Sequence, residues 1–535
     1  MSAQRFWPAV QILGRGFINV RADTPFFHHQ NVTKAYNVRN FNNGHSNVPN
    51  QIFYPPSHDW RHTPNVQDFT SAATPQNNVH SNRVCDSSLQ EACISVFKDS
   101  ENEHAHDVLR SLPAYNLTTT TRGLMQPSKC FAPIMNEDFI FQKTDWSKVP
   151  PFDLAQAFLN LSEQCYFKHM DLENSNYSLF CQTLANRMPL LNDDLLLHLL
   201  KSLSLWPPTA NTTTPNFMLI WNTLDKVLTE RISKWNTEML FLVADHWYAL
   251  RLSRITKFNP EMVKVLGKKV KQMTPSQIVQ YLFYANLSRQ LSPFIVLKDL
   301  EKQLISSLNH LTIEELGVIA MGFFKTQTFP KNIALLEAIL KKTSENLHCI
   351  SDPALGAILK LLRRTIPVSH WSEMMKLMDS LVPHVNHLNH MCLLQIALLG
   401  NDLLVFHPEI ISKITCRFAQ NINEIRLKDL ERITFVLMLY NFIPPDQPDI
   451  LEIITDELRK QERKEEISQY SRCFVSCVVY LVTMGHMPHD LISAALHPSM
   501  LKQLQSKLTY TISFALYFFS IVNKSSGNHD NIFWI

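Results

Sequence analysis

Apolar residues recur at intervals of three and four residues from Pro150 to about Leu508, as in the series Leu316, Ile319 and Phe323. This spacing places apolar side chains on one face of a helix, whereas a half-buried strand would need strict alternation. The pattern therefore predicts a long series of amphipathic α-helices.

Candidate helix caps and prolines also repeat along the chain, with a period much longer than that of a helix. Candidate N-cap residues Asn236, Thr274, Thr312 and Ser351 follow one another at steps of 38, 38 and 39 residues. Prolines recur about every 40 residues, and each precedes a new amphipathic run: Pro207, Pro260, Pro293, Pro330, Pro367, Pro408, Pro444 and Pro488.

Forty residues accommodate two helices and two short turns. Each repeat is predicted to contain a helix after a Ser, Thr or Asn cap, then a second helix with proline at or near its first turn. Because one hairpin cannot bury its own apolar face, neighbouring hairpins should stack. The predicted fold is all-α, a helical-hairpin repeat solenoid with about 40 residues per repeat.

Residues 23–150 are rich in Asn, His, Ser, Thr and Pro, which predicts a disordered, low-complexity linker. His28, His29, His104 and His106 lie in it, but their spacing matches no standard metal site, which favours solvated side chains. Residues 1–22 contain three arginines, no acid and interleaved apolar residues. That composition is typical of a mitochondrial presequence, and an ordinary flexible terminus is the alternative.

Whole-chain composition agrees with this division. The 535 residues are 45% apolar and 18% charged, with only 11 glycines, so a folded helical protein is favoured over a disordered one or a glycine-dependent nucleotide fold. The ten cysteines include no CxxC pair, which disfavours a zinc ribbon and a disulfide scaffold. The formal net charge is +3, so a nucleic-acid surface would have to be a local patch.

The run from Phe435 to Pro445, FVLMLYNFIPP, resembles the first characteristic segment of the FAST-kinase-domain proteins, a mitochondrial RNA-binding family. Residues 481–504, with Gly485 and Pro488 in a Gly-x-x-Pro turn, resemble the second segment. The resemblance divides the repeat region into helical repeats at 151–400 and FAST-kinase-like helical segments at 401–507. It implies a presequence, a variable linker, a helical array, and a role in the maturation or stability of mitochondrial transcripts.

Members of that family end in a RAP domain, an α/β module of about sixty residues that resembles nuclease folds. Residues 508–535 are too few for it and read as a divergent tail, so the chain is expected to lack this module. Within the tail, residues 508–522 are mostly apolar but too short for a stable membrane span.

The chain lacks the motifs of phosphoryl transfer. It contains no GxGxxG, GxxxxGK[ST], HRD or DFG sequence. We therefore expect no kinase activity, no cofactor and no small-molecule substrate. Histidines 384, 387 and 390 follow at steps of three, with Cys392 beyond them, and a solvated helix face is favoured over a zinc site. Asp193 and Asp194 are expected to stabilise the start of a helix through its dipole.

The strongest functional signal is a cluster of cations between residues 251 and 271, where seven basic residues accompany the single acid Glu261. Within this segment, one helical stripe is apolar and an opposite stripe carries Lys264, Lys268 and Lys271. Later repeats could continue the basic track, because equivalent positions of a solenoid line up. The candidate RNA-binding residues are Arg251, Arg254, Lys257, Lys264, Lys268, Lys269, Lys271, Lys341, Lys342, Arg363 and Arg364.

Phosphates would bind such a track by charge neutralisation, and Phe258, Tyr281 and Tyr284 could stack on unpaired bases unless they belong to the core. The resulting prediction is a non-enzymatic RNA-binding protein of the mitochondrial matrix, acting in processing, stability or expression of mitochondrial transcripts with other RNA-processing proteins as further partners. The alternative is a helical-repeat scaffold that binds another polypeptide. A basic face that is only solvated and binds nothing would be compatible with both the RNA-binding protein and the scaffold.

Overall fold

The computed structural model describes residues 100–505, except 113–114, 116–143, 169–171, 173–174, 207–213 and 404. Every regular element in these residues is a helix, which confirms the all-α prediction. None of the helices described is long and apolar enough to cross a bilayer. The presequence at 1–22, most of the linker and the tail at 508–535 lie outside the described residues.

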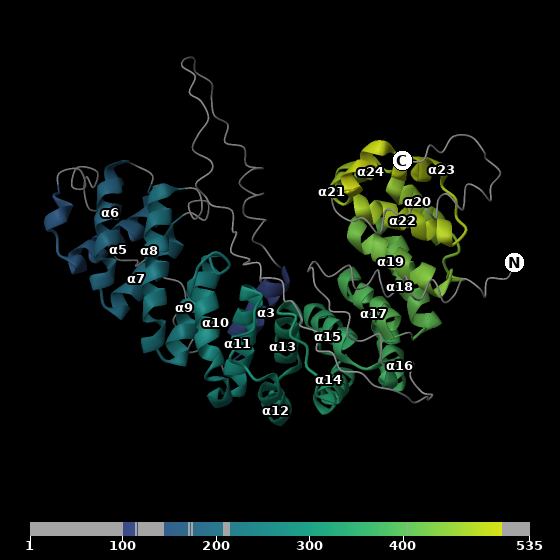
Figure 1. The fold of residues 1–535 in the computed structure, drawn as a ribbon, viewed down its shortest axis with the longest axis horizontal. Helices are drawn as coiled ribbons and strands as arrows, with labels where there is room; N and C mark the ends of the chain where they lie inside the picture. The colour runs from purple at the N-terminus through teal and green to yellow at the C-terminus, as the bar shows by residue number, and fades with distance from the viewer. Residues whose placement is uncertain are drawn as a thin grey trace, which may run out of the picture. The chain divides into compact units, whose positions relative to one another are not determined.

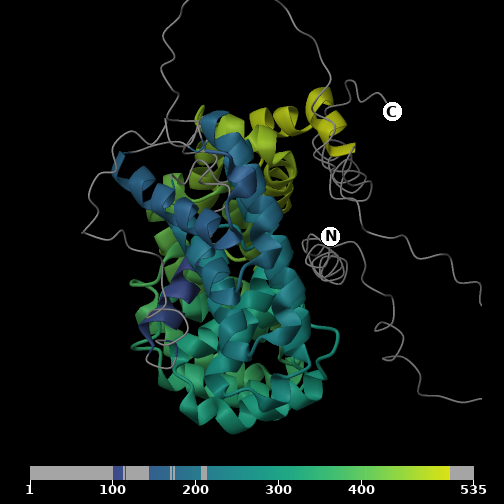
Figure 2. The same cartoon turned by 90° about the vertical axis from the view of Figure 1, so that its left-hand side faces the viewer.

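The helices alternate between two rows (Figures 1 and 2). Row A contains α5 (Pro151–Lys168), α7 (Asp193–Ser202), α9 (Thr237–Ala249), α11 (Pro275–Ser288), α13 (Ile313–Lys325), α15 (Asp352–Thr365), α17 (His390–Leu403), α19 (Leu427–Tyr440) and α22 (Ser471–Thr483). Row B contains α6 (Ser178–Arg187), α8 (Pro215–Arg231), α10 (Phe258–Gly267), α12 (Leu297–Ser307), α14 (Ile333–Glu345), α16 (Trp371–Leu381), α18 (Pro408–Gln420), α20 (Ile450–Arg459) and α23 (His489–Ala495). Three further α-helices of the described residues are α3 (Ser100–Ser111), α21 (Arg463–Gln469) and α24 (Pro498–Gln505).

Successive helices of one row pack against each other. From α11 to α22 each row A helix contacts the next, and from α12 to α23 each row B helix does the same. Two rows joined by short connections are the arrangement of a helical-hairpin solenoid, so the predicted repeat architecture is confirmed.

The predicted caps mark the starts of row A helices. Asn236, Thr274, Thr312 and Ser351 are the N-cap residues of α9, α11, α13 and α15, and each side chain accepts a hydrogen bond from a backbone N–H of the first turn. Thr274 and Thr312 also form complete capping boxes with Gln277 and Glu315.

The repeated prolines lie near the starts of row B helices, and most of them precede the first residue of the helix. Pro260 and Pro408 lie in the first turns of α10 and α18. Pro293, Pro330 and Pro444 lie in the connections before α12, α14 and α20. Proline suits the first turn of a helix because the missing N–H has no partner there, and it suits a connection because it favours an extended residue before it.

Several row A helices end in the same backbone motif. Arg251, Arg289, Gln327, Asn441 and Gly485 have positive φ values, between 46° and 86°. In each case the N–H of this residue donates to the carbonyl oxygen three positions before it. The N–H of the next residue donates to the carbonyl oxygen five positions before that residue, which completes the Schellman arrangement. Only one of the five is glycine, so the usual sequence signal is absent.

The middle helices of row A are deeply buried. All ten residues from Ile278 to Leu287 of α11 are buried, so this helix is enclosed on every side. Glycine permits the close approach of α13 to α15, because a Cβ added at Gly317 would lie 2.7 Å from the Cα of Ala354. The packing of these helices leaves little freedom in their sequence.

Within the described residues, α3 and the 3-10 helix Trp146–Lys148 fall inside the interval predicted to be linker. Helix α3 (Ser100–Ser111) packs on α11, α13 and α15 of row A and buries Ala105, Val108 and Leu109 (Figures 1 and 2). Its mean composition is polar, but these three side chains lie three and four residues apart on one face. The structure therefore differs from the linker expectation at residues 100–111, because contacts with the array stabilise a helix that composition alone does not favour.

Candidate nucleic-acid interface

The predicted cations between 251 and 271 occupy the α9–α10 connection, α10 and the turn that follows α10. Arg251, Arg254 and Lys257 are exposed in the connection. Lys264 is exposed on α10, Lys268 and Lys271 are exposed after it, and Lys269 is half-buried. All seven basic groups therefore have at least partial access to solvent.

The two stripes predicted for this segment are present. Met262, Leu266, Val270 and Met273 are buried, whereas Lys264, Lys268 and Lys271 are exposed. The apolar stripe holds the segment against the array, and the basic stripe is free of that packing role.

Two of these lysines have acidic neighbours. The Nζ of Lys264 lies 3.4 Å from Glu261, and the Nζ of Lys271 lies 2.9 Å from Asp299. A hydrogen bond from Lys271 lowers the pKa of the Asp299 carboxyl. The lysine side chains remain 50% and 75% exposed, so water and salt screen both pairs. Such pairs are weak enough for a phosphate to replace the carboxylate.

Lys268 lies over an exposed aromatic ring. Its Nζ is 4.5 Å from the ring centroid of Phe294, which belongs to the α11–α12 connection and is 49% exposed. A cation beside an accessible ring offers contacts to a phosphate and to an unpaired base. Helical periodicity does not reveal Phe294, because this residue lies in a connection between helices.

The three aromatic residues that could either stack on bases or belong to the core are core residues. Phe258, Tyr281 and Tyr284 are fully buried. The ring of Phe258 packs near Trp235, and Tyr284 stacks on Phe241. Burial raises the pKa of Tyr284 well above its usual value, and the nearby carboxylate of Asp245 adds to this rise. The core alternative therefore holds for these three residues, and their rings are not accessible to bases.

The cations predicted in later repeats lie on other helices than the cations between 251 and 271. Lys341 and Lys342 belong to the last turns of α14, and Arg363 and Arg364 belong to the last turn of α15. Lys342 donates to the backbone carbonyl oxygens of Leu308 and Leu311, at 2.7 and 2.5 Å. This lysine holds the end of the preceding row B helix, which is a structural role.

Two arginines occupy equivalent places in successive repeats. Arg251 and Arg289 are 38 residues apart, both are exposed, and both have left-handed backbones at the ends of α9 and α11. A residue with a Cβ costs about 1 kcal/mol more than glycine in this conformation. Arg289 was not predicted, although its distance from Arg251 matches the capping period.

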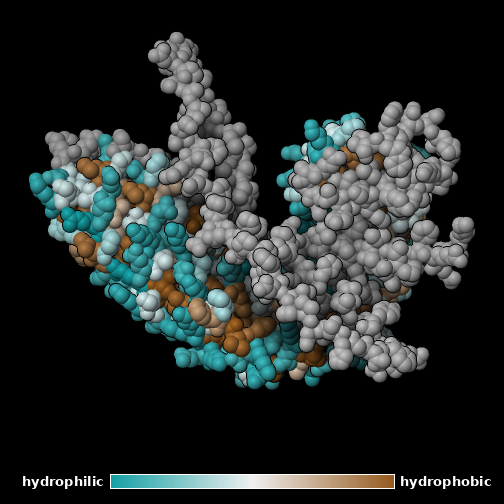
Figure 3. Space-filling model, in the orientation of Figure 1, coloured by the Kyte–Doolittle hydropathy of each residue, from teal (hydrophilic) through white to brown (hydrophobic). Residues whose placement is uncertain are grey.

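Exposed apolar side chains also repeat. In seven successive hairpins, a large apolar residue with substantial exposure lies between the row A helix and the start of the row B helix. Figure 3 shows hydrophobic patches within the hydrophilic surface in the area that α11 and α12 occupy in Figure 1. The repeated residues are Ile255, Phe294, Ile333, Val368, Phe406, Ile443 and Met487.

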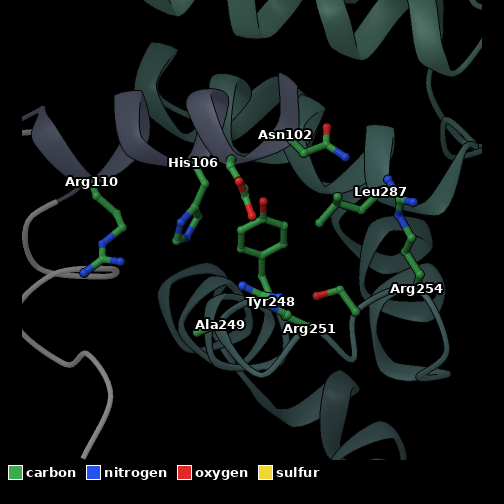
Figure 4. A pocket seen from close by; sticks show the side chains of 10 residues that line it. Asn102, His106, Arg110, Tyr248, Ala249, Arg251, Arg254 and Leu287 are labelled. Carbon is green, nitrogen blue, oxygen red and sulfur yellow. The ribbon is translucent and has the colours of Figure 1, made fainter. Parts of the chain in front are cut away.

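The basic α9–α10 connection meets α3 at an open cavity of about 180 Å³. Arg251, Arg254 and Tyr248 line one side, and His106 and Arg110 of α3 line the other (Figure 4). Glu103 also lines this cavity, so it is not purely cationic.

Other residues considered for metal binding have structural partners. His106 bonds to Asp245, and His104 bonds to Glu314 and Ser351. Asp193 lies in the first turn of α7, as predicted, and bonds to Arg231 and Trp235 of later elements. Across the part of the chain that the structure describes, no group of three His, Cys, Asp or Glu side chains is arranged to hold a metal ion.

Comparison with known proteins supports the family suggested by the two C-terminal segments. No family model matches the chain. FAST kinase domain-containing protein 5, mitochondrial, of Mus musculus is 21% identical over 376 residues, which cover 69% of this chain and 47% of the relative. The chain is a distant homologue of the FAST kinase domain-containing proteins.

The protein of the same name from Homo sapiens is 22% identical over 350 residues, covering 65% of this chain and 44% of that relative. The chain thus matches less than half the length of these FAST-kinase-domain relatives. Both relatives are named as mitochondrial proteins, which supports a mitochondrial location for this homologue.

Proposed function

We propose that this chain binds RNA in the mitochondrial matrix and acts in the processing, stability or expression of mitochondrial transcripts. The observation that carries the proposal is the surface formed by α10, the turn after it and the α11–α12 connection. On this α10 surface Lys264, Lys268 and Lys271 are exposed, and the Nζ of Lys268 lies 4.5 Å from the centre of the exposed ring of Phe294. Distant homology to a mitochondrial family with RNA-related roles agrees with this use of the surface.

The surface suits single-stranded RNA better than a duplex. Neutralising phosphates needs exposed cations, and Phe294 adds a ring on which an unpaired base can stack. A base inside a duplex is already stacked on its neighbours and has no face to offer. The protein contributes binding without chemistry of its own, in keeping with a sequence that holds none of the phosphate-binding motifs of kinases.

Crosslinking in isolated mitochondria, followed by sequencing of the bound RNA, tests this function. The Lys264→Ala, Lys268→Ala and Lys271→Ala triple variant is the comparison, and Lys226, Lys464 and Lys502 supply a control triple of exposed lysines on other helices. We expect transcripts to be enriched with the wild type and the control, and reduced with the first triple. Recovery no greater than that of an unrelated matrix protein would contradict RNA binding.

A protein-binding scaffold is the second candidate, and the repeated exposed apolar residues favour it. Several of them, including Ile255, Ile333 and Ile443, are aliphatic and stack poorly on bases but pack well against another polypeptide. Replacing these three with Ser should release a protein partner and leave RNA binding by the α10 surface unchanged. If RNA binding were lost instead, the apolar residues would belong to the RNA surface.

The matrix location rests on the presequence expected in residues 1–22. Replacing Arg5, Arg15 and Arg21 with Glu should prevent import of a reporter fused to residues 1–25, because import requires positive charge. Fluorescence microscopy with a matrix marker reads this out. Unchanged mitochondrial location of the triple variant would remove the presequence argument.

A further inference from the structure

Helix α3 lies across four helices of row A, although it comes from a polar stretch far earlier in the chain. Its side chains contact α9 through His106, α11 through Asn102, α13 through Glu101 and His104, and α15 through Glu101. It therefore covers the surface that these four successive row A helices would otherwise present.

The interface between α3 and row A combines the buried apolar side chains of α3 with buried polar pairs. The side chains of His106 and Asp245 bond at 2.5 Å, those of Asn102 and Asn286 bond at 2.6 Å, and the Oδ1 atom of Asn286 is left without a partner. Interfaces of this kind dissociate more readily than apolar ones, because water can satisfy each group that the partner releases.

Glu101 neutralises two cations from neighbouring repeats. Its carboxylate bonds to the Nζ of Lys325 at 2.9 Å and to the Nζ of Lys360. The lysine side chains are only 18% and 14% exposed. Two sheltered ammonium groups need an anion between them, because uncompensated charges are costly away from water.

A phosphodiester can replace that carboxylate. It too is an anion whose oxygens can accept hydrogen bonds from two ammonium groups at once. The ring of Phe324 lies 6.0 Å from the Nζ of Lys360 and places an aromatic face beside the pair. Cations and an aromatic face are the components of a single-stranded nucleic-acid site.

We propose that Lys325 and Lys360 form a second phosphate-binding site for RNA on row A, and that Glu101 of α3 occupies it until RNA displaces the helix. This inference rests on the proposed RNA-binding function. RNA first held by the α10 surface would compete with α3 for the lysines, and α3 would act as an internal substitute for the ligand. Binding would then require that α3 leave.

The test compares Glu101→Gln with Asp107→Asn in the full chain. Both remove one negative charge from α3, but Asp107 is exposed. Binding of a mixed-sequence, single-stranded oligoribonucleotide is followed by fluorescence anisotropy, and exchange of the backbone amides of residues 100–111 is followed by mass spectrometry. We expect Glu101→Gln to bind RNA at least about threefold more tightly than Asp107→Asn, because it weakens the contact that competes with RNA.

RNA should also accelerate amide exchange in α3 of the wild-type chain. In the Glu101→Gln background, replacing Lys325 and Lys360 with Ala should lower the salt slope of binding by about 1.4, since each lost phosphate contact removes about 0.7. If Lys325 and Lys360 only stabilise the docking of α3, their replacement should leave the salt slope of RNA binding unchanged.

The possible outcomes separate the two proposals. If RNA binds but α3 stays protected at saturating RNA, or if Glu101→Gln binds no more tightly than Asp107→Asn, the inference is overturned and the α10 surface still stands. If neither the wild type nor any variant binds RNA, the proposed function fails and the inference fails with it.

Discussion

Row A and row B are built from the same hairpins, yet their sequences carry different information. Row A helices such as α11 are buried on all sides, and glycine is placed where two of them approach closely. Row B helices such as α10 are buried on one face and present charge on the other. Packing therefore dictates most of the row A sequence, whereas the outer face of a row B helix carries charge that packing does not require.

The largest effect should come from disturbing row A. Gly317→Ala should destabilise the array by about 1 to 3 kcal/mol, the usual cost of overpacking, because the new Cβ would meet the backbone of Ala354. Gly356→Ala is the matched control, since a Cβ there meets nothing within 4 Å. The control should gain up to about 1 kcal/mol from helix propensity.

Chemical denaturation followed by circular dichroism measures both changes. Equal destabilisation by the two alanines would mean that the close approach of α13 to α15 does not limit the sequence.

A smaller effect, confined to one helix, should follow from acid. Burial opposes ionisation of Glu101, but Lys360 and Lys325 outweigh it and hold its pKa at about 2, below the usual 4.5. A lowered pKa contributes stability that is complete above about pH 4.5 and is lost as the pH falls toward 2. The docking of α3 should therefore weaken across this window.

Amide exchange of residues 100–111 as a function of pH, corrected for the intrinsic exchange rate, measures this loss. Glu101→Gln should flatten the dependence. A variant that retained the full pH response would assign the effect to other carboxylates.

The smallest change in stability is expected at the ends of row A helices. Arg251→Gly and Arg289→Gly should each raise stability by up to about 1 kcal/mol, because glycine adopts the left-handed conformation without cost. Gln327→Gly occupies the same backbone position two repeats after Arg251 and is the uncharged control.

If the two arginines contact RNA, their replacement should also lower the salt slope of binding by about 1.4, whereas the control should leave it unchanged. Thermal unfolding and anisotropy titrations in the same buffer separate the two effects. A gain in stability without a change in slope would assign Arg251 and Arg289 no role in binding.

The repeat architecture was predictable because its determinants are local. The caps at Asn236, Thr274, Thr312 and Ser351 act within one helical turn, so their spacing reveals the hairpin period directly. The contacts of α3 were not predictable, because Glu101 is separated from Lys325 and Lys360 by more than two hundred residues. Only the folded array brings these charges together.

The candidate interface was predictable only where its determinants are local. The basic face of α10 follows from helical periodicity, and the structure exposes it as expected. Periodicity could not distinguish buried aromatic residues such as Tyr281 from accessible ones such as Phe294, because that depends on neighbouring helices. It also could not show that Lys342 is used to hold backbone carbonyl groups.

The central claim is that the exposed lysines of α10 and the turn after it bind the RNA backbone. The most direct test is the salt dependence of RNA affinity for the Lys264→Ala, Lys268→Ala and Lys271→Ala triple variant, measured with two unrelated single-stranded sequences. We predict an equal loss of affinity for both sequences, a slope lower by about 2, and little change in stability. An unaltered slope in the folded triple variant would contradict the claim and show that this face is only solvated.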